Sequence, residues 1–464
     1  MKKQPKKRLF IVAGIFTTAI AAALIKQLKF EDDDNYLVSI APLLYENVDE
    51  HTKKEAEQIG LFKQILFYFD YCPPKQNYKD EKSHIFSFDL KRFRNDINHV
   101  MFDEIYSIYI HGAANHLFNQ YPKADLYFVE DGTATYLKMD NAEKINKRAK
   151  KIYTLNYFNK IEPFVSLYEG LKSEQIDKNI VRTVFEDLAK QTATKFEPKE
   201  KSVIFCTQNI SINPTAMTYQ AEFDLYAKNI VKLLNKGYFV YFKEHPKTPN
   251  MFYKHLKKAI QHPNFVCLDE LNVLPIETLI PILKPSAIVS MFSSSLLTAP
   301  WIFDVPSFTF FAENEFKDHQ IFGISHMMVA AYIPHVDSIN KDLKLTIDAF
   351  NMFMNKTEKI KNNAIYRIKL IDFFKLFISK REFYRLKKQY KKSHKFLLRC
   401  AYLNDDVIQL FEEKNYIDYL IHYAESLSKL YQAKMTAIKK QPRTLKTGLA
   451  LIKDGIGIIL KLIL

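Results

Sequence analysis

A histidine stands at the end of one apolar run of this sequence and is followed at once by a proline. The stretch "GYFVYFKEHPKTP", residues 237–249, is aromatic and β-branched before it continues with Lys243-Glu244-His245-Pro246. Pro246 restricts His245 to an extended backbone, which fixes the direction of the imidazole. Histidine titrates near neutral pH, so a residue held in this way can donate a proton to a departing group. The alternative is a core histidine at a proline turn.

Two carboxylates follow another apolar run. In "ADLYFVEDGTATYL" the run ends in Glu130-Asp131-Gly132, which places both acidic side chains on a tight glycine turn. A carboxylate at the edge of a desolvated crevice has a raised pKa and can act as a general base. The alternative for the same residues is a helix-capping aspartate followed by a turn glycine.

Serines and a glutamate have the chemistry to bind a nucleotide. In "KPSAIVSMFSSSLLTAP" an apolar run leads into Ser293-Ser294-Ser295 and then into an apolar helical pattern. Hydroxyls and the unpaired amides at a helix N-terminus form a cradle for phosphate, although simple N-capping uses the same residues. Glu277, in "LPIETLIPIL", stands near the start of a helix. A carboxylate there can accept both hydroxyls of a ribose, or it can pair with the helix dipole.

These features are more specific together than apart. One half of the chain offers a carboxylate base, and the other half offers a histidine acid, a phosphate cradle and a ribose ligand. In open parallel sheets, ligands bind beyond the carboxyl ends of the strands, and each of the three main features follows a predicted strand. The set suits transfer of a group from a nucleotide donor to a hydroxyl.

Predicted strands and helices alternate along the chain around these residues. In the first half we expect strands over 8–13, 36–41, 64–69, 104–109 and 125–130, and helices over 16–29, 51–60, 112–120 and 164–192. After a polar linker at about 190 to 202, further strands are predicted at "SVIFCTQ", "YFVYFKE", "NFVCLD", "SAIVSMF" and "SFTFF", with helices between them. Such alternation predicts an α/β protein with two facing Rossmann-like domains.

The domain boundaries follow from the same pattern. We expect an N-terminal acceptor-side domain over 1–192, a nucleotide-binding domain over 200–335 and a helical extension over 336–464. The extension contains a basic stretch, 380–399, and an amphipathic tail, 443–464. Lysines amid leucines and isoleucines are typical of a helix on a membrane surface. The alternative for the basic stretch is an ordinary solvated helix face. The alternative for the tail is packing against the second domain.

The N-terminus mimics a signal peptide or a membrane anchor. Basic residues precede an apolar stretch from Leu9 to Ile25, which is short for a helix that spans a membrane. The stretch also divides at Gly14 into "RLFIVAG", typical of a buried strand, and "FTTAIAAALIKQL", typical of a helix. With "NYLVSIAP" as the next strand, this region predicts a cytosolic βαβ unit.

Composition restricts the kinds of partner. The chain has 464 residues, of which 47% are hydrophobic and 26% charged, and its formal net charge is +15. Such a charge implies an acidic partner, but no zinc finger, RNA-binding motif or glycine-rich phosphate loop accompanies it, so we expect no nucleic acid. The four cysteines form no CxxC pair, which favours a reducing cytoplasm.

The order of the motifs resembles that of the bacterial sialyltransferases. Strand–Glu-Asp-Gly, strand–Lys-Glu-His-Pro, "LPIE" and a serine pair after a strand are similar to the D/E-D/E-G, HP and serine motifs of those families, over roughly residues 8–310. The resemblance is closest to the capsular polysialyltransferase and lipooligosaccharide sialyltransferase families. It implies a GT-B fold and an inverting, metal-independent transfer from CMP-sialic acid.

The resemblance also implies a role for each motif residue. Glu130 would be the general base on the acceptor hydroxyl, with Asp131 as the fallback and Gly132 as the turn. His245 would protonate or hydrogen-bond the leaving phosphate of CMP. That phosphate would be held by Ser294 and Ser295 with Ser293 beside them, the ribose by Glu277, and the same nucleotide site would include Lys243 and Pro246.

We expect neither a cofactor nor a metal ion. GT-A enzymes neutralise a nucleoside diphosphate with a divalent ion on a DxD motif, whereas CMP leaves with one phosphate that a histidine and hydroxyls can satisfy. The best DxD candidate, Asp32-Asp33-Asp34, follows the first predicted helix, on the wrong side of the sheet. A solvated turn is the better interpretation of these aspartates.

The sequence therefore predicts a sialyltransferase in the cytoplasm, peripheral to the inner membrane, that acts on an anionic surface glycan. The glycan would be a capsular polysaccharide or a lipooligosaccharide. One alternative keeps the fold and changes the donor: a polyol-phosphate or other sugar transferase of capsule synthesis. The other is a non-catalytic scaffold at the membrane surface.

Overall fold

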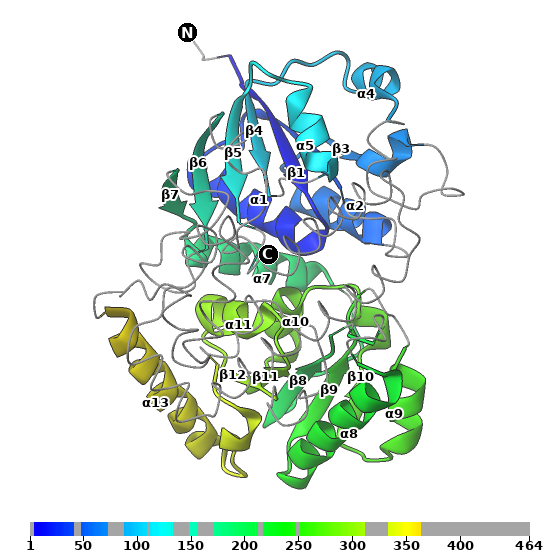
Figure 1. Ribbon diagram of the computed structural model, residues 1–464, viewed down its shortest axis with the longest axis vertical. Helices are drawn as coiled ribbons and strands as arrows, with labels where there is room; N and C mark the ends of the chain where they lie inside the picture. Colours follow the sequence, from blue (N-terminus) through cyan, green and yellow to red (C-terminus); the bar gives the residue numbers. More distant parts are fainter. Residues whose placement is uncertain are drawn as a thin grey trace, which may run out of the picture.

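Two parallel sheets with helices on both faces form the part of the chain that the structure describes, and they lie one above the other in Figure 1. The structure is a computed structural model. It describes residues 4–40, 48–72, 88–108, 112–130, 132, 148–155, 171–192, 194–208, 210–211, 217–246, 251–310 and 333–362. Asp131, the basic stretch 380–399 and the tail 443–464 lie outside the described residues.

The upper sheet has seven strands in the order β3-β2-β1-β4-β5-β6-β7, and each neighbouring pair is parallel. Its strands are β1 (Lys7–Val12), β2 (Asp34–Ser39), β3 (Gln64–Phe67), β4 (Glu104–Ser107), β5 (Asp125–Val129), β6 (Ala149–Thr154) and β7 (Lys172–Gln175). The described helices of this half are α1 (Ile15–Leu28), α2 (Val48–Ile59), α4 (Leu90–Asp96), α5 (Gly112–Asn119) and α7 (Lys178–Gln191). The strand order reverses at β1, as in a Rossmann-like sheet.

The lower sheet repeats this plan with five parallel strands in the order β10-β9-β8-β11-β12. Its strands are β8 (Ser202–Cys206), β9 (Phe239–Lys243), β10 (Phe265–Cys267), β11 (Ala287–Ser290) and β12 (Ser307–Thr309). The helices are α8 (Tyr219–Asn235), α9 (Tyr253–Ala259), α10 (Ile276–Leu283), α11 (Ser295–Phe303) and α13 (Leu343–Asn362). Its order reverses between β8 and β11, where a doubly wound sheet binds its ligand.

The apolar N-terminal stretch is part of the core, as the βαβ prediction requires. β1 pairs with β2 on one side and β4 on the other, and Leu9 to Val12 are fully or almost fully buried. Gly14 adopts a φ of 96°, which favours glycine, and α1 follows it with buried residues on all its sides. Among the described residues, no helix combines the length and apolar composition needed to cross a bilayer.

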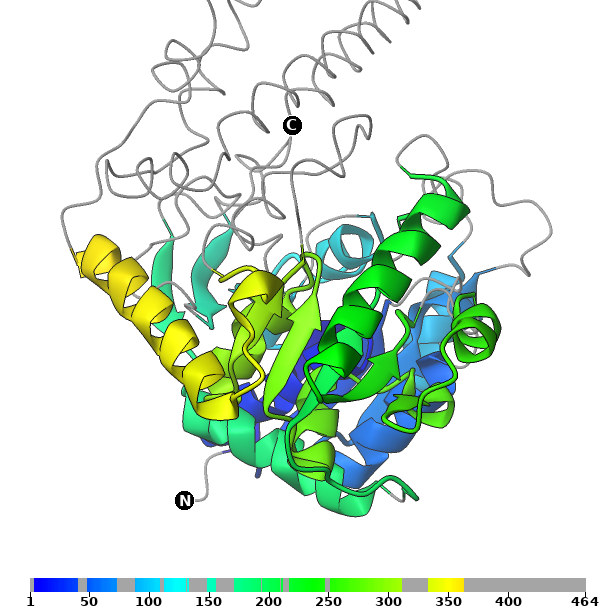
Figure 2. The ribbon, with the colours of Figure 1, turned by 90° about the horizontal axis from the view of Figure 1, so that it is seen from below.

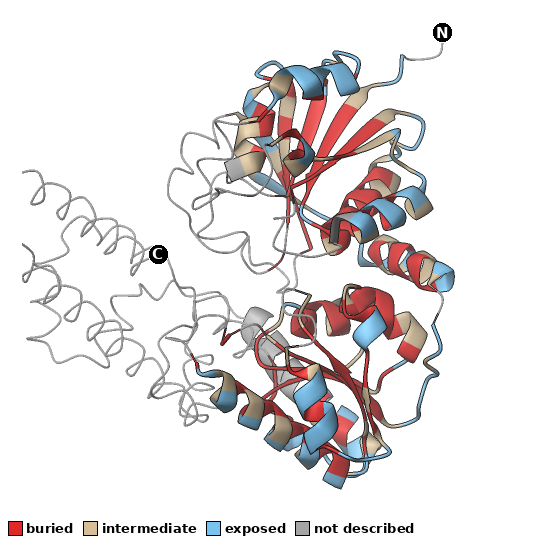
Figure 3. Ribbon diagram, turned by 90° about the vertical axis from the view of Figure 1, so that its right-hand side faces the viewer, coloured by how far each residue is buried: buried red, intermediate tan, exposed pale blue. Residues whose placement is uncertain are grey.

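Alternate residues of the strands belong to different cores. Val203 and Phe205 of β8 face a core that includes residues of α8, α9 and α13, whereas Ile204 and Cys206 face a core with α10 and α11. Figure 3 shows both sheets buried between helices whose outward faces are exposed. Seen from below, α13 lies beside β12 at one end of the lower sheet, and α8 and α9 lie toward the other (Figure 2).

One apolar core is shared by both halves of the molecule. It contains β1 residues such as Phe10, β8 residues such as Ile204, and residues of α1, α7, α10 and α11. The middle of this core is α7, which packs against α1 and α2 above and against α10 and α11 below. Val181, Val184, Phe185 and Leu188 form its buried stripe at helical spacing. The two sheets are therefore joined by burial of apolar surface.

Polar contacts reinforce this junction at the end of α11. The guanidinium of Arg182 in α7 donates to the carbonyl of Ile302, and its other end forms a 2.5 Å ion pair with Asp304. Asp304 is the left-handed residue that ends α11. Because the ion pair is partly exposed, it contributes about 1 kcal/mol or less to the free energy of unfolding. Its main effect is to hold α7 against the end of α11.

The structure corrects the prediction at the edge of the upper sheet. A helix was expected over 164–192, but residues 172–175 form β7 and α7 begins only at Lys178. The sequence of β7, "KSEQ", carries no apolar alternation because it is an edge strand whose side chains are largely exposed. β6 was not predicted either. Residues 156–170 lie outside the described residues.

The first prediction concerns α1. Leu24 is fully buried in the shared core, so Leu24→Ala should lower the free energy of unfolding by about 2–5 kcal/mol. Urea denaturation followed by circular dichroism measures this change. Glu57→Ala, on the exposed side of α2, is the control and should change stability by about 0.5 kcal/mol or less. An anchor or cleaved signal would give the two variants equal stability, which would contradict the buried position of α1.

Candidate active site

His245 follows the end of β9, beside the carboxyl end of β8. Its backbone amide donates to the hydroxyl of Thr207, which comes directly after β8, at 2.8 Å. The side chain is half-buried. Burial lowers the pKa of the imidazole to about 4, and the positive charge of Lys243 acts in the same direction. His245 is therefore neutral at neutral pH in the protein without ligand, so it is suited to donate a hydrogen bond.

Lys243, the last residue of β9, lies inside the lower domain, with 4% of its surface exposed. Its ammonium donates to the backbone carbonyl of Asn272 at 2.8 Å and, at 3.4 Å, to that of Glu244. Burial lowers the pKa of this ammonium to about 8, whereas the nearby Cys206, Glu277 and Glu244 raise it. The predicted contact between Lys243 and a nucleotide stays a prediction.

Glu277, in the first turn of α10, is also buried, with 4% exposed. The hydroxyl of Thr298 in α11 donates to its carboxylate. Burial raises the pKa of Glu277, while this hydrogen bond, a backbone amide and the charge of Lys243 lower it. Thr298 thus connects the two helices that follow β10 and β11. The role of Glu277 as a ribose ligand stays a prediction.

The three serines differ in exposure. Ser295 begins α11 and is buried, and its hydroxyl donates to the hydroxyl of Ser293 at 2.8 Å. The amide of Ser295 also donates to the Ser293 hydroxyl, at 3.3 Å. Ser294 is exposed, and Ser293 is half-buried. The hydroxyl of Ser293 therefore accepts the first amide of α11, while Ser294, the N-cap residue, is exposed and makes no capping bond with its side chain.

The glycine of the acidic motif lies against the serine motif. A β-carbon placed on Gly132 would lie 3.8 Å from the Cβ of Ser294. Gly132 has a φ of 119°, a conformation that side chains disfavour. The turn after β5 and the start of α11 therefore meet across the two halves of the molecule, which brings the Glu-Asp-Gly motif to the serine motif.

Glu130 is fully buried at the end of β5. Its backbone amide donates to the carbonyl of Tyr153, and its carboxylate accepts the amide of Leu155 at 2.6 Å. The carboxylate thus holds the end of the neighbouring strand, β6. Asp131 lies outside the described residues. The base role of Glu130 and its pairing with His245 both stay predictions.

Sequence reasoning missed several residues that support the site. Thr207 and Thr298 hold His245 and Glu277, and Asn272 binds both Lys243 and the amide of Glu244. The carboxylate of Glu244 accepts the amides of Phe252 and Tyr253 at the start of α9. The position of Thr207 directly after a strand was the one available signal. The others depend on contacts between distant segments.

The aspartates considered for a metal site lie at the other end of the upper sheet. Asp33 forms an ion pair with Arg8, and Asp34 forms one with Lys63 at 2.8 Å. Asp33 precedes β2 and Asp34 begins it, so both lie away from the carboxyl ends of the strands. Across the described ranges of the chain, no group of three histidine, cysteine or acidic side chains is placed to hold a metal ion.

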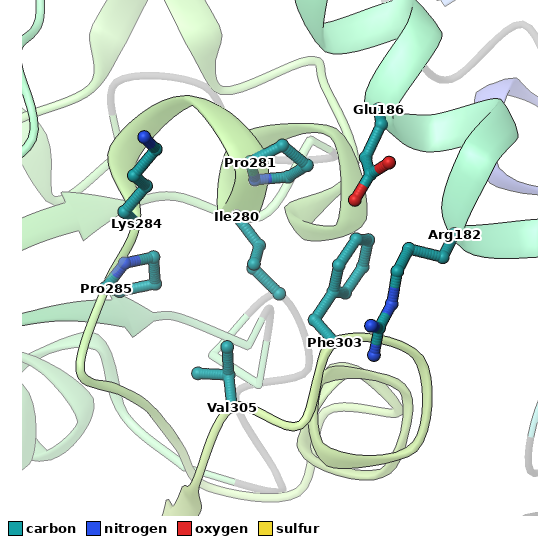
Figure 4. Close-up of a pocket in the computed structure, with 8 residues that line it drawn as sticks. All are labelled: Arg182, Glu186, Ile280, Pro281, Lys284, Pro285, Phe303 and Val305. Atoms are coloured by element: carbon teal, nitrogen blue, oxygen red, sulfur yellow. The ribbon is translucent and has the colours of Figure 1, made fainter. Parts of the chain in front are cut away.

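A pocket of about 260 Å³ opens where α7 meets the ends of α10 and α11 (Figure 4). Its walls are Arg182, Glu186, Ile280, Pro281, Lys284, Pro285, Phe303 and Val305. None of the predicted site residues lines it. The pocket lies at the carboxyl ends of these helices, whereas the serines and Glu277 lie at their amino ends. It therefore belongs to the interdomain junction.

The fold and the strand-end residues define a class of protein. Two Rossmann-like domains whose strand-end motifs meet form the GT-B architecture of glycosyltransferases. A family model described as "Alpha-2,8-polysialyltransferase (POLYST)" matches residues 8–312 of the 464. The chain belongs to this family and is a glycosyltransferase of the sialyltransferase class. A sequence comparison with curated proteins returned no match.

Several solved structures show a distant similarity to this chain at low sequence identity. MurG of Acinetobacter baumannii is 10% identical, with 77% of this chain and 99% of that chain covered and a TM-score of 0.40. The UDP-GlcNAc 2-epimerase of Methanocaldococcus jannaschii is 13% identical, with 75% and 93% covered and a TM-score of 0.46. The GT-B domain of the Photobacterium damselae sialyltransferase is 11% identical, with 75% of this chain and 97% of that chain covered and a TM-score of 0.36. These similarities are too distant to bear on activity.

Gly132 gives the second prediction. Because the φ of Gly132 strains any side chain, Gly132→Ala should shift the turn against Ser294. Misplacement of this kind should lower turnover by about 10-fold or more. Gly60→Ala is the matched control, since Gly60 also has a positive φ, 68°, and ends α2. It should cost about 1 kcal/mol of stability with turnover unchanged. Full turnover in Gly132→Ala would show that the conformation of this turn does not affect the reaction.

His245 gives a pH-dependent prediction. Its folded pKa of about 4 lies below the ordinary value of 6.5, so the unfolded chain binds the proton first as the pH falls. The stability contributed by neutral His245 is present above about pH 6.5 and is lost as the pH falls toward about 4. Between these pH values, His245→Asn should lose less unfolding free energy than the wild type, by on the order of 1–3 kcal/mol.

Urea denaturation at a series of pH values measures this difference. His99→Asn, a change at an exposed residue with a φ of 52° that asparagine tolerates, is the control and should follow the wild-type curve. If wild type and His245→Asn lose stability in parallel, the imidazole is not held neutral by burial.

Proposed function

We propose that the protein transfers sialic acid from CMP-sialic acid to a hydroxyl of a bacterial surface glycan, with inversion and without a metal ion. The observation that carries this proposal is the approach of Gly132 to Ser294. It brings the motif of acceptor-side carboxylates against the motif of phosphate-binding serines. An acceptor hydroxyl and the donor phosphate would then meet at one place, as direct displacement requires.

His245 acts in this proposal as a neutral hydrogen-bond donor to the leaving phosphate. Burial and the charge of Lys243 keep its pKa low without a ligand. The second pKa of a phosphate monoester is about 6, so CMP can depart as an anion that hydrogen bonds stabilise. The bound phosphate would raise the pKa of His245, because a nearby negative charge favours imidazolium.

The serines divide their roles according to their exposure. The Ser293 hydroxyl accepts from both the amide and the hydroxyl of Ser295. Its own proton can then point to the phosphate. In our proposal Ser293 and the exposed Ser294 bind the phosphate, and Ser295 orients Ser293 from inside the domain. The start of α11 adds the favourable dipole of a helix N-terminus.

The general base is Glu130 or its neighbour Asp131. The Glu130 carboxylate accepts the Leu155 amide inside the upper domain, so an acceptor must reach into the turn to meet it. Asp131 follows it in the sequence. We propose Glu130 as the base because it is the first acid of the motif. The turnover of variants at both positions distinguishes Glu130 from Asp131.

The charge of the chain supports an anionic acceptor. A net charge of +15 would attract a sialylated glycan and the anionic inner face of a membrane. We therefore propose a polysialic capsule or a lipooligosaccharide as the product, made in the cytoplasm at the membrane surface. The same charge would serve a polyol-phosphate transferase, so the donor must be identified by assay.

The decisive experiment is a transfer assay in EDTA with CMP-sialic acid. The protein is incubated with sialylated and with lactose-terminated acceptors, and release of CMP and elongation of the glycan are measured. We expect both with at least one acceptor. Absence of CMP release with every acceptor would overturn the proposal. CDP-polyol donors, assayed in parallel, would support the polyol-phosphate transferase if they alone react.

Substitutions then assign the roles. His245→Ala and Glu130→Gln should each lower turnover by about 10²-fold or more, as expected for loss of a group that acts at the reacting atoms. Asp131→Asn should have the smaller effect if Glu130 is the base, and the reverse ranking would transfer that role to Asp131. Glu57→Gln, on the exposed side of α2, is the control and should keep wild-type turnover. Full turnover in His245→Ala and Glu130→Gln would contradict the roles assigned to these two residues. A non-catalytic scaffold would show no turnover in the wild type with any donor.

A further inference from the structure

The three residues Lys243, Glu244 and His245 are bound to two neighbouring segments of the lower domain. The His245 amide donates to Thr207 after β8, at 2.8 Å. The Glu244 amide donates to the side-chain oxygen of Asn272, at 2.9 Å. The Lys243 ammonium donates to the backbone carbonyl of the same Asn272, at 2.8 Å. The direction of the imidazole therefore depends on contacts that lie far from it in the sequence.

Asn272 is bound through both its backbone and its side chain. It is buried, with 3% of its surface exposed. It also stands in the segment that leads from β10 into α10, shortly before Pro275, which precedes the helix, and Glu277 in the first turn. Any shift of Asn272 would consequently move the end of β9 and the start of α10 together. The histidine and the predicted ribose ligand are coupled through this one residue.

A buried ammonium at Lys243 is costly in free energy. Removing a cation from water is repaid only by good hydrogen bonds and nearby opposite charge. Here the carbonyl of Asn272 accepts from it, and Glu277 and Glu244 lie close enough to raise its pKa. An apolar side chain such as methionine could fill similar space without the desolvation cost. The ammonium therefore contributes more to the geometry of this strand end than to stability.

We propose that Lys243 and Asn272 are positioning residues that fix His245 and the start of α10 in one arrangement around the departing nucleotide. The proposal rests on the proposed function, because it assigns the nucleotide to this edge of the sheet. Both residues act from inside the domain, with 4% and 3% of their surface exposed. In this proposal Lys243 acts from behind the nucleotide site, whereas the sequence-based prediction placed it in direct contact with the nucleotide.

Geometry explains why such residues affect the rate. A hydrogen-bond donor stabilises a leaving phosphate only if it lies at hydrogen-bond distance in the transition state. Displacement by about 1 Å costs about 100-fold in rate. The loss of a partner that orients a ligand residue lowers activity or affinity by about 10–100-fold. Lys243 and Asn272 should therefore influence turnover without contact with the substrate.

The test uses the full-length protein and variants of Lys243 and Asn272. Lys243→Met removes the bond to the Asn272 carbonyl, and Asn272→Ala removes the acceptor for the Glu244 amide. Each should lower kcat by about 10-fold or more. Asn272→Asp keeps an acceptor oxygen for that amide, so it should restore kcat to within about 3-fold of wild type.

Lys201→Met is the matched control. The Lys201 ammonium also donates to a backbone carbonyl, that of Lys236, at 2.7 Å, but at the amino end of the lower sheet. The kcat of Lys201→Met should stay within about 2-fold of wild type, although this variant also loses a hydrogen bond from a lysine ammonium to a backbone carbonyl. Thermal unfolding of every variant confirms that a lower kcat is not a loss of folded protein.

A double variant separates positioning from general weakening. If Lys243 acts through His245, then Lys243→Met in a His245→Ala background should lower kcat by less than about 3-fold further. A full additional loss of about 10-fold would show independent action and overturn the proposal. Wild-type kcat in both Lys243→Met and Asn272→Ala would overturn it as well.

A measurement without substrate distinguishes failure of this proposal from failure of the proposed function. With ¹⁵N-histidine labelling, the amide signal of His245 is assigned by its loss in His245→Asn. The signal should shift in Lys243→Met and Asn272→Ala and stay in place in Lys201→Met. An unmoved signal in the first two variants overturns the positioning role. Failure of wild type to use CMP-sialic acid, with the signal shifted as expected, overturns only the proposed function.

Discussion

The arrangement of this molecule depends on one continuous apolar core that joins its two sheets. α7 lies in the middle of that core and packs against α1 and α2 above and against α10 and α11 below. Because both sides of the junction are closely packed, the sheets cannot slide past each other without exposure of apolar surface. The turn at Gly132 therefore meets the start of α11 at Ser294, and two short motifs from different halves of the chain lie against each other.

Buried carboxylates organise the loops at the strand ends. Glu130 accepts the amide of Leu155, Glu244 accepts the amides of Phe252 and Tyr253, and Glu222 in α8 accepts the amides of Ile210 and Ser211. A carboxylate has enough acceptor sites to satisfy two amides, and a charged acceptor makes a stronger bond than a neutral one. The chain has only ten glycines. Its strand-end loops are held by these acceptors, where other nucleotide-binding folds rely on glycine-rich turns.

The chemistry of His245 follows from its surroundings more than from its type. Burial and the cation at Lys243 both disfavour imidazolium, so the residue begins as a neutral donor. The same ammonium donates a hydrogen bond to the backbone carbonyl of Asn272 and lies near Glu277. One buried ammonium thus affects the charge state of the histidine and the position of the strand end. This arrangement lowers stability locally, which is common where a protein orients groups for function.

The class of fold and the order of the motifs could be predicted from the sequence alone. Apolar runs such as "SVIFC" and helical stripes such as that of α7 predict elements because burial on one or both faces leaves a regular pattern. The strand-end positions of Glu130, His245 and the serines follow from the same pattern. Three features could not be predicted: β7, with its polar "KSEQ", joins the sheet, Ser295 is buried while Ser294 is exposed, and Asn272 binds the residue that follows β9. These outcomes depend on contacts between segments that are distant in the chain, and local patterns of side chains carry no signal of them.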